Sequence, residues 1–109
     1  MDRLTFEFDG HGARHARDPV VVGVVASGNL EVLIESDPDD ACCHFEVATA
    51  AHGFDEVWAA VLADFVARAK IAGVRVSIND VGATPAVVSL RLDQAIEEYR
   101  GTAALHTHR

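Results

Sequence analysis

Hydrophobic and polar positions alternate at the start of the chain. Leu4, Phe6 and Phe8 are separated by single polar residues, and this period of two predicts a strand with one apolar face. Four further runs rich in apolar and β-branched residues predict more strands, at 19–26, 30–35, 42–49 and 74–79. The polar segment 9–18 contains two glycines and predicts a loop between the first two strands.

Two later segments repeat their apolar residues at helical spacing instead. A helix is predicted over 54–70, and Gly73 follows as a stop signal. Its apolar stripe consists of Phe54, Val57, Trp58, Val61, Leu62, Phe65, Val66 and Ala69. We expect this stripe, with its aromatic residues, to lie in the core.

The second helix is introduced by a capping signal. Thr84 suits the N-cap and Pro85 suits the first helical position, where a missing N–H costs nothing. The apolar stripe that follows consists of Val88, Leu92, Ala95, Ile96 and Tyr99. Gly101 is expected to end this helix, with a frayed tail after it. The β-branched residues at 87 and 88 leave a strand as the alternative for the start of the segment.

The order of these elements predicts the fold class. Strands followed by a helix, a strand and a helix are typical of an α+β protein. We therefore predict a mainly antiparallel sheet of about five strands with two helices packed on one face. A chain of 109 residues, half of them hydrophobic, is long enough to bury one core, so we predict a single domain over 1–109.

Composition narrows the classes of function. The formal net charge of -8 argues against nucleic acid and anionic membranes as partners, and suits docking on a basic protein surface. The sequence shows neither a run of 18 apolar residues nor a signal-peptide pattern, so we expect no membrane span and no export. Cys42 and Cys43 are neighbours that face opposite sides of a strand, so we expect no disulfide between them. Together these features favour the cytoplasm.

One serine stands at the corner of a tight turn. The apolar run from Val20 to Ala26 leads into Ser27, and Gly28-Asn29 separates it from the next apolar run. Both turn residues accept the positive φ that a two-residue hairpin turn requires. The segment from 18 to 67 contains no Lys or Arg, so no cation lies near Ser27 in sequence. A serine without a base or a cation nearby is unusual for a nucleophile and natural for an attachment point.

The length of the turn decides where Ser27 points. A two-residue turn places Ser27 opposite Leu30, on the face that also contains Val25 and Val32. A longer turn releases the serine from that face. The accessibility of its hydroxyl therefore depends on a position at the very end of the sheet.

Three sequence stretches go beyond fold class. They are LTFEF at 4–8, GVVASGNLEVLIE at 23–35 and VSINDVGATPAVVSLRLDQAIEEY at 76–99. At this separation they resemble the acyl carrier protein family, the δ or C subunit, of bacterial malonate decarboxylase. The resemblance covers most of the chain and fades after Tyr99. The chain has Ala26 and Asn29 where Gly and Asp are expected in many relatives, and both residues keep turn chemistry.

The resemblance implies a covalent prosthetic group. The serine matching Ser27 carries 2′-(5″-phosphoribosyl)-3′-dephospho-CoA through a phosphodiester, with Gly28 and Asn29 in its turn. The carrier has no catalytic residues and no metal of its own, and its thiol arm carries acetyl and then malonyl. The implied partners are a transferase subunit that exchanges acetate for malonate, a pair of decarboxylase subunits, and the enzyme that attaches the arm. Docking is expected around Gly28, Asn29 and the turn at 80–85.

Two other proteins fit the same sequence features. The related carrier subunit of citrate lyase uses the same type of prosthetic group, although GATPAVV and the LRL-x-QA run favour malonate decarboxylase. A plain interaction or regulatory subunit without an arm is the alternative from another class. The DSL-type serine motif and all-helical pattern of ordinary phosphopantetheine carriers are missing from this sequence.

We expect the remaining reactive residues to have structural rather than catalytic roles. Four histidines in loops or the tail have spacings that a metal allows, but they lack a fixed set of partners; they are His11, His15, His106 and His108. Neither Cys42 nor Cys43 has a flanking cation that lowers a thiol pKa, so both are expected to be half-buried strand residues. A triad of Ser27, a histidine and Asp80 is disfavoured because no GxSxG elbow is present. We expect Asp80 to bind backbone amides in the turn before Gly82.

Overall fold

The computed structural model describes residues 2–12, 14–23 and 29–107, with side chains described through Gly101. Its elements, in chain order, are β1 (Asp2–Asp9), β2 (Val20–Gly23), β3 (Leu30–Ser36), β4 (Cys42–Thr49), α1 (Asp55–Ala69), β5 (Val74–Asp80) and α2 (Pro85–Thr107). Five strands and two helices confirm the predicted α+β class.

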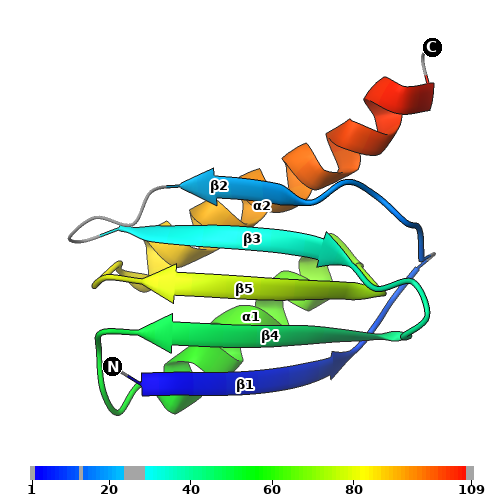
Figure 1. Ribbon diagram of the computed structural model, residues 1–109. Helices are drawn as coiled ribbons and strands as arrows, with labels where there is room; N and C mark the ends of the chain where they lie inside the picture. Colours follow the sequence, from blue (N-terminus) through cyan, green and yellow to red (C-terminus); the bar gives the residue numbers. More distant parts are fainter. Residues whose placement is uncertain (1, 13, 24–28, 108–109) are drawn as a thin grey trace.

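The strands form one sheet in the order β1-β4-β5-β3-β2 (Figure 1). β4 and β5 are parallel because α1 crosses over between them, whereas the other three pairs are antiparallel. The sheet is therefore mainly antiparallel, as predicted. β1 and β2 follow each other in sequence but lie at opposite edges, so residues 10–19 connect the two edges.

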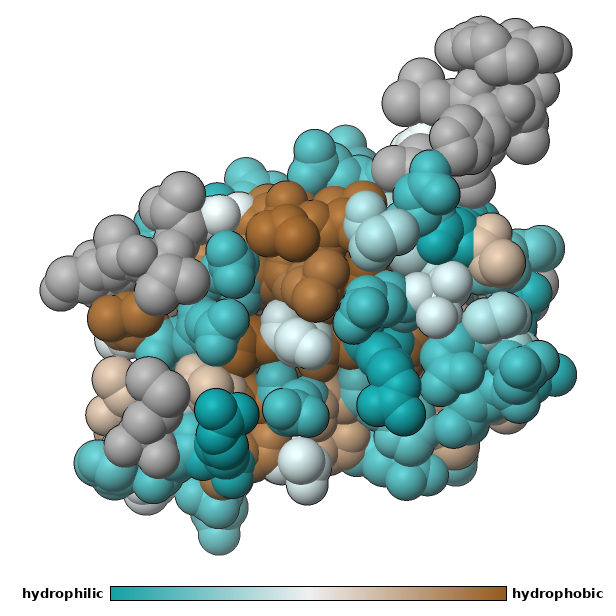
Figure 2. Space-filling model, viewed as in Figure 1, coloured by the Kyte–Doolittle hydropathy of each residue, from teal (hydrophilic) through white to brown (hydrophobic). Residues whose placement is uncertain are grey.

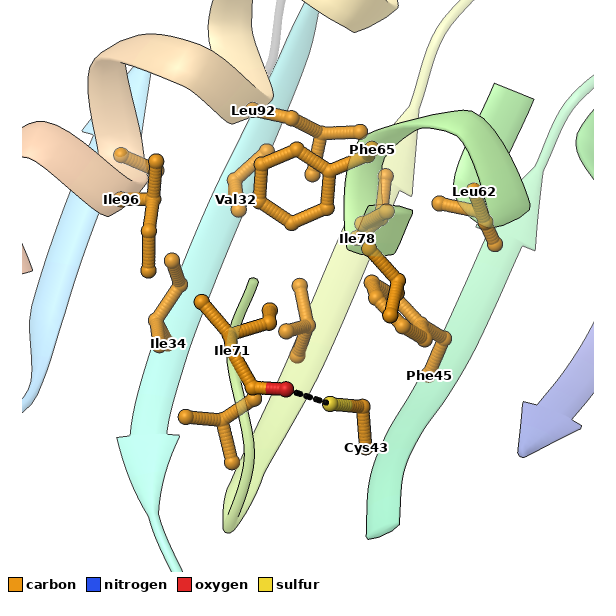
Figure 3. Close-up of a cluster of buried hydrophobic side chains, with 14 of the residues drawn as sticks. Val32, Ile34, Cys43, Phe45, Leu62, Phe65, Ile71, Ile78, Leu92 and Ile96 are labelled. Carbon is orange, nitrogen blue, oxygen red and sulfur yellow. Dashed lines mark hydrogen bonds between the residues drawn. The ribbon is translucent and has the colours of Figure 1, made fainter. Parts of the chain in front are cut away.

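Both helices lie on one face of the sheet (Figure 1), and the hydrophobic core fills the space between the helices and the sheet. Alternate residues of each strand point into it, and Phe45 of β4 meets Phe65 of α1 edge to face, with ring centroids 6.3 Å apart. Figure 3 shows this cluster, with the Cys43 thiol donating a hydrogen bond to the carbonyl of Ile71 over 3.3 Å. Each large apolar side chain buried here stabilises the fold by roughly 1.5–3 kcal/mol.

The opposite face of the sheet is not covered by a helix. Figure 2 views this face, where hydrophilic residues predominate and apolar surface gathers over β2 and β3. In that region Val21, which is 57% exposed, lies opposite Leu33. Among the helices that the structure describes, none is long and apolar enough to cross a membrane.

Two helix predictions need correction. α2 continues through Gly101 to Thr107, because a glycine can remain helical at a cost of about 1 kcal/mol relative to alanine. The strand alternative at 87 and 88 is excluded, since both residues are helical. In α1, Trp58 is buried as expected, but Phe54 and Val57 are 50% and 43% exposed. The first turn of α1 lies at the edge of the sheet, where nothing that the structure describes covers these two side chains.

Candidate functional site

The hairpin formed by β2 and β3 has a different register from the predicted one. Ser27 and Gly28 lie outside the described residues, but the strands that flank them are described. Val22 lies opposite Val32, and Gly23 lies opposite Glu31. A two-residue turn at 28–29 places Val25 opposite Val32, which is three residues from the observed register. The register of the described strands therefore favours the longer turn, the alternative in which Ser27 is released from the face of Val32.

Gly23, the last described residue of β2, has an unusual backbone conformation. Its φ is +95°, a left-handed conformation that side chains with a Cβ rarely adopt. A Cβ at this position would lie 2.3 Å from the carbonyl oxygen of Leu30 and 3.0 Å from Nε of Arg91. Both strands and α2 therefore approach one another closely at Gly23, beside the segment that contains Ser27.

Asn29 holds the other side of the same opening. Its carbonyl oxygen accepts a hydrogen bond from the backbone N–H of Val81 over 2.9 Å. Its side-chain Oδ1 accepts from the N–H of Leu30 at 2.8 Å and from Nη2 of Arg91 at 2.9 Å. We call Gly23, Asn29, Val81 and Arg91 the neck of the Ser27 segment. The Val81 contact places the 80–85 turn beside Asn29.

Arg91 is the functional-site residue that sequence reasoning missed. The guanidinium lies between the two sides of the neck, against Gly23 and Asn29. No cation lies near Ser27 in sequence, but α2 brings an arginine to Asn29 from 62 positions along the chain. One feature of the sequence pointed to Arg91. Arg91 precedes the fully buried Leu92, at the border of the apolar stripe of α2, where a long side chain reaches the sheet.

Asp80 fixes the turn beside the neck. The residue is only 3% exposed, and its Oδ2 accepts a hydrogen bond from Thr49 Oγ1 at 2.7 Å. Its Oδ1 accepts from the backbone N–H of Ala83 at 2.8 Å. The predicted structural role in the turn is confirmed. Both carboxylate oxygens are engaged, so the Ser27–His–Asp80 triad gains no support.

An apolar groove lies at the same end of the sheet. It is a cavity of about 310 Å³ between the start of α1 and the turn that leads into α2, lined by Ala51, Phe54, Val57, Trp58, Val61, Asp80, Gly82, Ala83, Pro85 and Val88. The exposed Phe54 and Val57 belong to this lining. The end of the sheet that contains the neck thus also carries this apolar groove.

The two cysteines are free thiols that lie apart from this site. Burial raises the pKa of the Cys43 thiol to about 11. A hydrogen bond with Glu7 raises the pKa of the Cys42 thiol to about 11. Both thiols are therefore protonated at neutral pH. Both lie in β4 as predicted, Cys42 half-buried as expected and Cys43 fully buried.

Metal-binding residues were sought in the part of the chain that the structure describes. No group of three or more His, Cys, Asp or Glu side chains there is arranged to hold a metal ion. The side chain of His106 and the whole of His108 lie outside it.

Comparison with known proteins gives consistent results. The family described as malonate decarboxylase delta subunit (MdcD) matches residues 17–99. A malonate decarboxylase acyl carrier protein of Xanthomonas campestris is 58% identical over 105 residues, which is 95% of this chain and 100% of that protein. The protein of the same name from Burkholderia cepacia is 56% identical over 98 residues, 90% of each chain.

A solved structure shares the fold. The crystal structure of a Pseudomonas malonate decarboxylase hetero-tetramer in complex with malonate contains a chain that is similar to this one with a TM-score of 0.81. The two sequences are 34% identical, and the match covers 91% of this chain and 99% of the other. The likeness therefore extends over most of the chain.

Proposed function

The chain belongs to the malonate decarboxylase delta subunit family, and from that premise we propose that Ser27 is the covalent attachment point of a phosphoribosyl-dephospho-CoA arm. The protein is an acyl carrier subunit of a malonate decarboxylase complex and is not itself the catalyst. The arm would be joined through a phosphodiester to the serine hydroxyl. When bound, the group supplies the thiol on which acetyl and malonyl are carried.

The single observation that carries this proposal is the neck. A carrier needs an attachment residue that is held on a rigid base. The neck supplies one, because hydrogen bonds and close contacts join β2, β3 and α2 there. The residues also fit an anionic group, because Arg91 offers a cation there and its buried Nε has no acceptor among the described residues. Asp80, the carboxylate of the neighbouring turn, is buried and already hydrogen-bonded, so it does not compete for that cation.

The chain's own residues would position the serine rather than activate it. Asn29 fixes one end of the Ser27 segment through three hydrogen bonds, and Gly23 fixes the other through close backbone contact. The partners would be a transferase subunit, decarboxylase subunits and the enzyme that attaches the arm, all acting in the cytoplasm. Each must reach the thiol, so we place their docking around Asn29 and the 80–85 turn.

Intact mass tests the attachment. The protein is co-expressed with its attachment enzymes and purified from the active complex, and its mass is measured. We expect an increment of one phosphoribosyl-dephospho-CoA unit, lost in Ser27→Ala. The matched control is Ser77→Ala, which removes a serine hydroxyl from the middle of β5 on the uncovered face of the sheet and should leave the increment unchanged.

The outcomes separate the alternatives. Native protein from an active complex without the increment, or an increment that survives in Ser27→Ala, would overturn the proposal and leave an interaction subunit without an arm. Turnover of citrate rather than malonate by the assembled complex would favour the citrate lyase carrier. The similar proteins of known name are malonate decarboxylase components, so malonate is the expected substrate.

A further inference from the structure

The apolar groove contains a side chain that serves neither its own helix nor the core. Phe54 is the N-cap residue of α1, and no side-chain hydrogen bond caps the helix there. Asn, Asp, Ser and Thr are preferred at an N-cap, because their side chains accept a hydrogen bond from the first turn. α2 follows this rule, since Thr84 Oγ1 accepts from the N–H of Val87 over 3.3 Å. At Phe54 the start of α1 therefore gives up stability that a common residue would supply.

Burial does not compensate for the missing cap. Phe54 is 50% exposed, and Val57, which lines the same groove, is 43% exposed. Among the described residues, Val21 and Leu90 are the other large apolar ones that are exposed, and neither belongs to the groove. Single exposed apolar residues are ordinary, whereas those that share a hollow mark contact with another molecule. Phe54 and Val57 form such a pair.

The groove has the shape to receive a side chain. Trp58 and Val88 are buried in its lining, whereas Phe54, Val57 and Pro85 are exposed. Its cavity of about 310 Å³ lies between the starts of α1 and α2, which both begin at this end of the sheet (Figure 1). An apolar side chain that enters it contacts both helices and leaves water, the conditions under which an anchor contributes most to binding.

The charges beside the groove select the surroundings of that anchor. Asp55 and Glu56 follow Phe54 in the first turn of α1, and both are exposed. Among the described residues, the ion pairs involve neither of these carboxylates. The described lining contains no Lys, Arg or His, and its Asp80 is buried. An acidic rim attracts a basic protein surface and repels anionic lipids and nucleic acid.

We propose that the apolar groove is the docking site of another subunit of the complex, which inserts an apolar side chain surrounded by lysine or arginine. The inference deepens the proposed function and rests on it for the identity of the partner. Asp80 lines the groove, and Val81, the next residue, binds Asn29 of the neck. A partner seated in the groove therefore lies beside the neck. Phe54 and Val57 hold the anchor, and Asp55 and Glu56 guide its approach.

Binding of the unloaded carrier to the other subunits of the complex, purified without this chain, tests the inference. Phe54→Asn removes the ring and supplies a good N-cap, so the urea midpoint should stay close to that of the wild type. We expect its affinity, measured by biolayer interferometry, to fall at least about tenfold through faster dissociation. Asp55→Asn combined with Glu56→Gln should instead slow association, by about threefold at low salt and not at high salt.

Leu90→Asn is the matched control. Leu90 is 56% exposed, close to the value of Phe54, but lies outside the groove lining. This variant should bind the subunits as the wild type does. Trp58 lines the groove and is the single tryptophan of the chain, so a fluorinated tryptophan reports on this site alone. Its fluorine resonance should shift when the subunits are added to the wild type, and should not shift in Phe54→Asn at the same concentration.

The outcomes separate this occupant from others. Unchanged affinity in a folded Phe54→Asn overturns the inference. So does a Trp58 shift that appears without subunits, whether at high carrier concentration, on loading of the arm or with phosphatidylcholine vesicles. If Phe54→Asn does not fold, the wild-type Trp58 shift on adding the subunits decides. The binding assay uses unloaded carrier, so the inference can fail while the mass increment at Ser27 stands, and the increment can be absent while the groove binds.

Discussion

The two ends of the sheet are held in different ways. At the end opposite Ser27, which we call the Cys42 end, main-chain hydrogen bonds join the neighbouring segments: Asp37 N–H to Gly73 O at 2.7 Å, His11 N–H to Ile71 O at 2.7 Å and Gly73 N–H to Cys42 O at 3.3 Å. At the Ser27 end, side chains do much of this work, among them Asn29, Thr49, Asp80 and Arg91.

The difference has a physical meaning. Main-chain hydrogen bonds form with almost any side chain, so these three contacts at the Cys42 end make little demand on side-chain chemistry, although Gly10 lies too close to the Ala41 carbonyl to accept a Cβ. Buried side-chain hydrogen bonds require particular residues, because an unmatched buried polar atom costs about 1–3 kcal/mol. The Ser27 end therefore depends on residue identity although none of these residues is needed as a catalyst. Positioning an attachment point is enough to explain that dependence.

The largest expected effect on stability comes from Gly23→Ala. A Cβ 2.3 Å from the Leu30 carbonyl and a φ of +95° combine a steric clash with backbone strain. We expect a loss of about 3 kcal/mol in the free energy of unfolding, measured by urea denaturation. Gly53→Ala is the control, since its φ of +78° is similar but no atom lies within 4 Å of the added Cβ. It should cost about 1 kcal/mol, from strain alone. Equal losses would mean that close packing at Gly23 is unimportant.

Asp80→Ala should have the next largest effect. The substitution leaves the Thr49 hydroxyl and the Ala83 N–H without the carboxylate oxygens that accept their hydrogen bonds. A loss of about 2 kcal/mol in the free energy of unfolding is expected, because both groups belong to a buried network. The matched variant at the Cys42 end is Asp40→Ala, which removes a carboxylate whose side chain is 37% exposed. A larger loss for Asp40→Ala than for Asp80→Ala would reverse the comparison between the two ends.

Acid titration tests the Cys42 end separately. The N–H of Cys42 donates to Asp40 Oδ1 at 2.8 Å, and this hydrogen bond, with a second from His44, lowers the pKa of Asp40 below 3.8. A lowered pKa in the folded state stabilises the protein above the ordinary pKa, and the contribution disappears as the pH falls through the lowered value. The stability difference between the wild type and Asp40→Asn should therefore shrink below pH 3.8. A difference that stays constant with pH would contradict this account.

The smallest effect is expected for His52→Ala. His52 Nδ1 lies 2.8 Å from Asp2 Oδ1 at the Ser27 end, but the two side chains are 69% and 34% exposed. Solvent-exposed pairs of this kind contribute little, so unfolding should change by no more than about 0.5 kcal/mol. This variant tests whether the burial of a contact, rather than its position at the Ser27 end, decides how much it contributes to stability. A loss as large as that of Asp80→Ala would show that every contact at this end matters, buried or not.

The sequence predicted the local features well. The period of apolar residues placed β4 at Cys42–Thr49 and began α2 at Pro85, as the structure has them. The two-residue turn at Gly28-Asn29 disagrees with the register of β2 and β3. Gly-Asn is a strong local turn signal, whereas the left-handed Gly23 lies against Leu30 and Arg91, which the local sequence does not show. Arg91 was missed for a related reason. Its role arises when α2 packs on β3, and no local pattern encodes the approach of residues that far apart in sequence.

The neck is also assembled from distant parts of the chain, which matters for the order in which a ribosome supplies them. β2 and β3 are consecutive in the chain and pair without an intervening helix, so this hairpin can begin to form early in synthesis. Val81 and Arg91 emerge 50 residues or more after Ser27. An unfinished chain thus contains the serine but not the structure around it. An attaching enzyme that recognises the neck would modify completed, folded carriers and pass over partial ones.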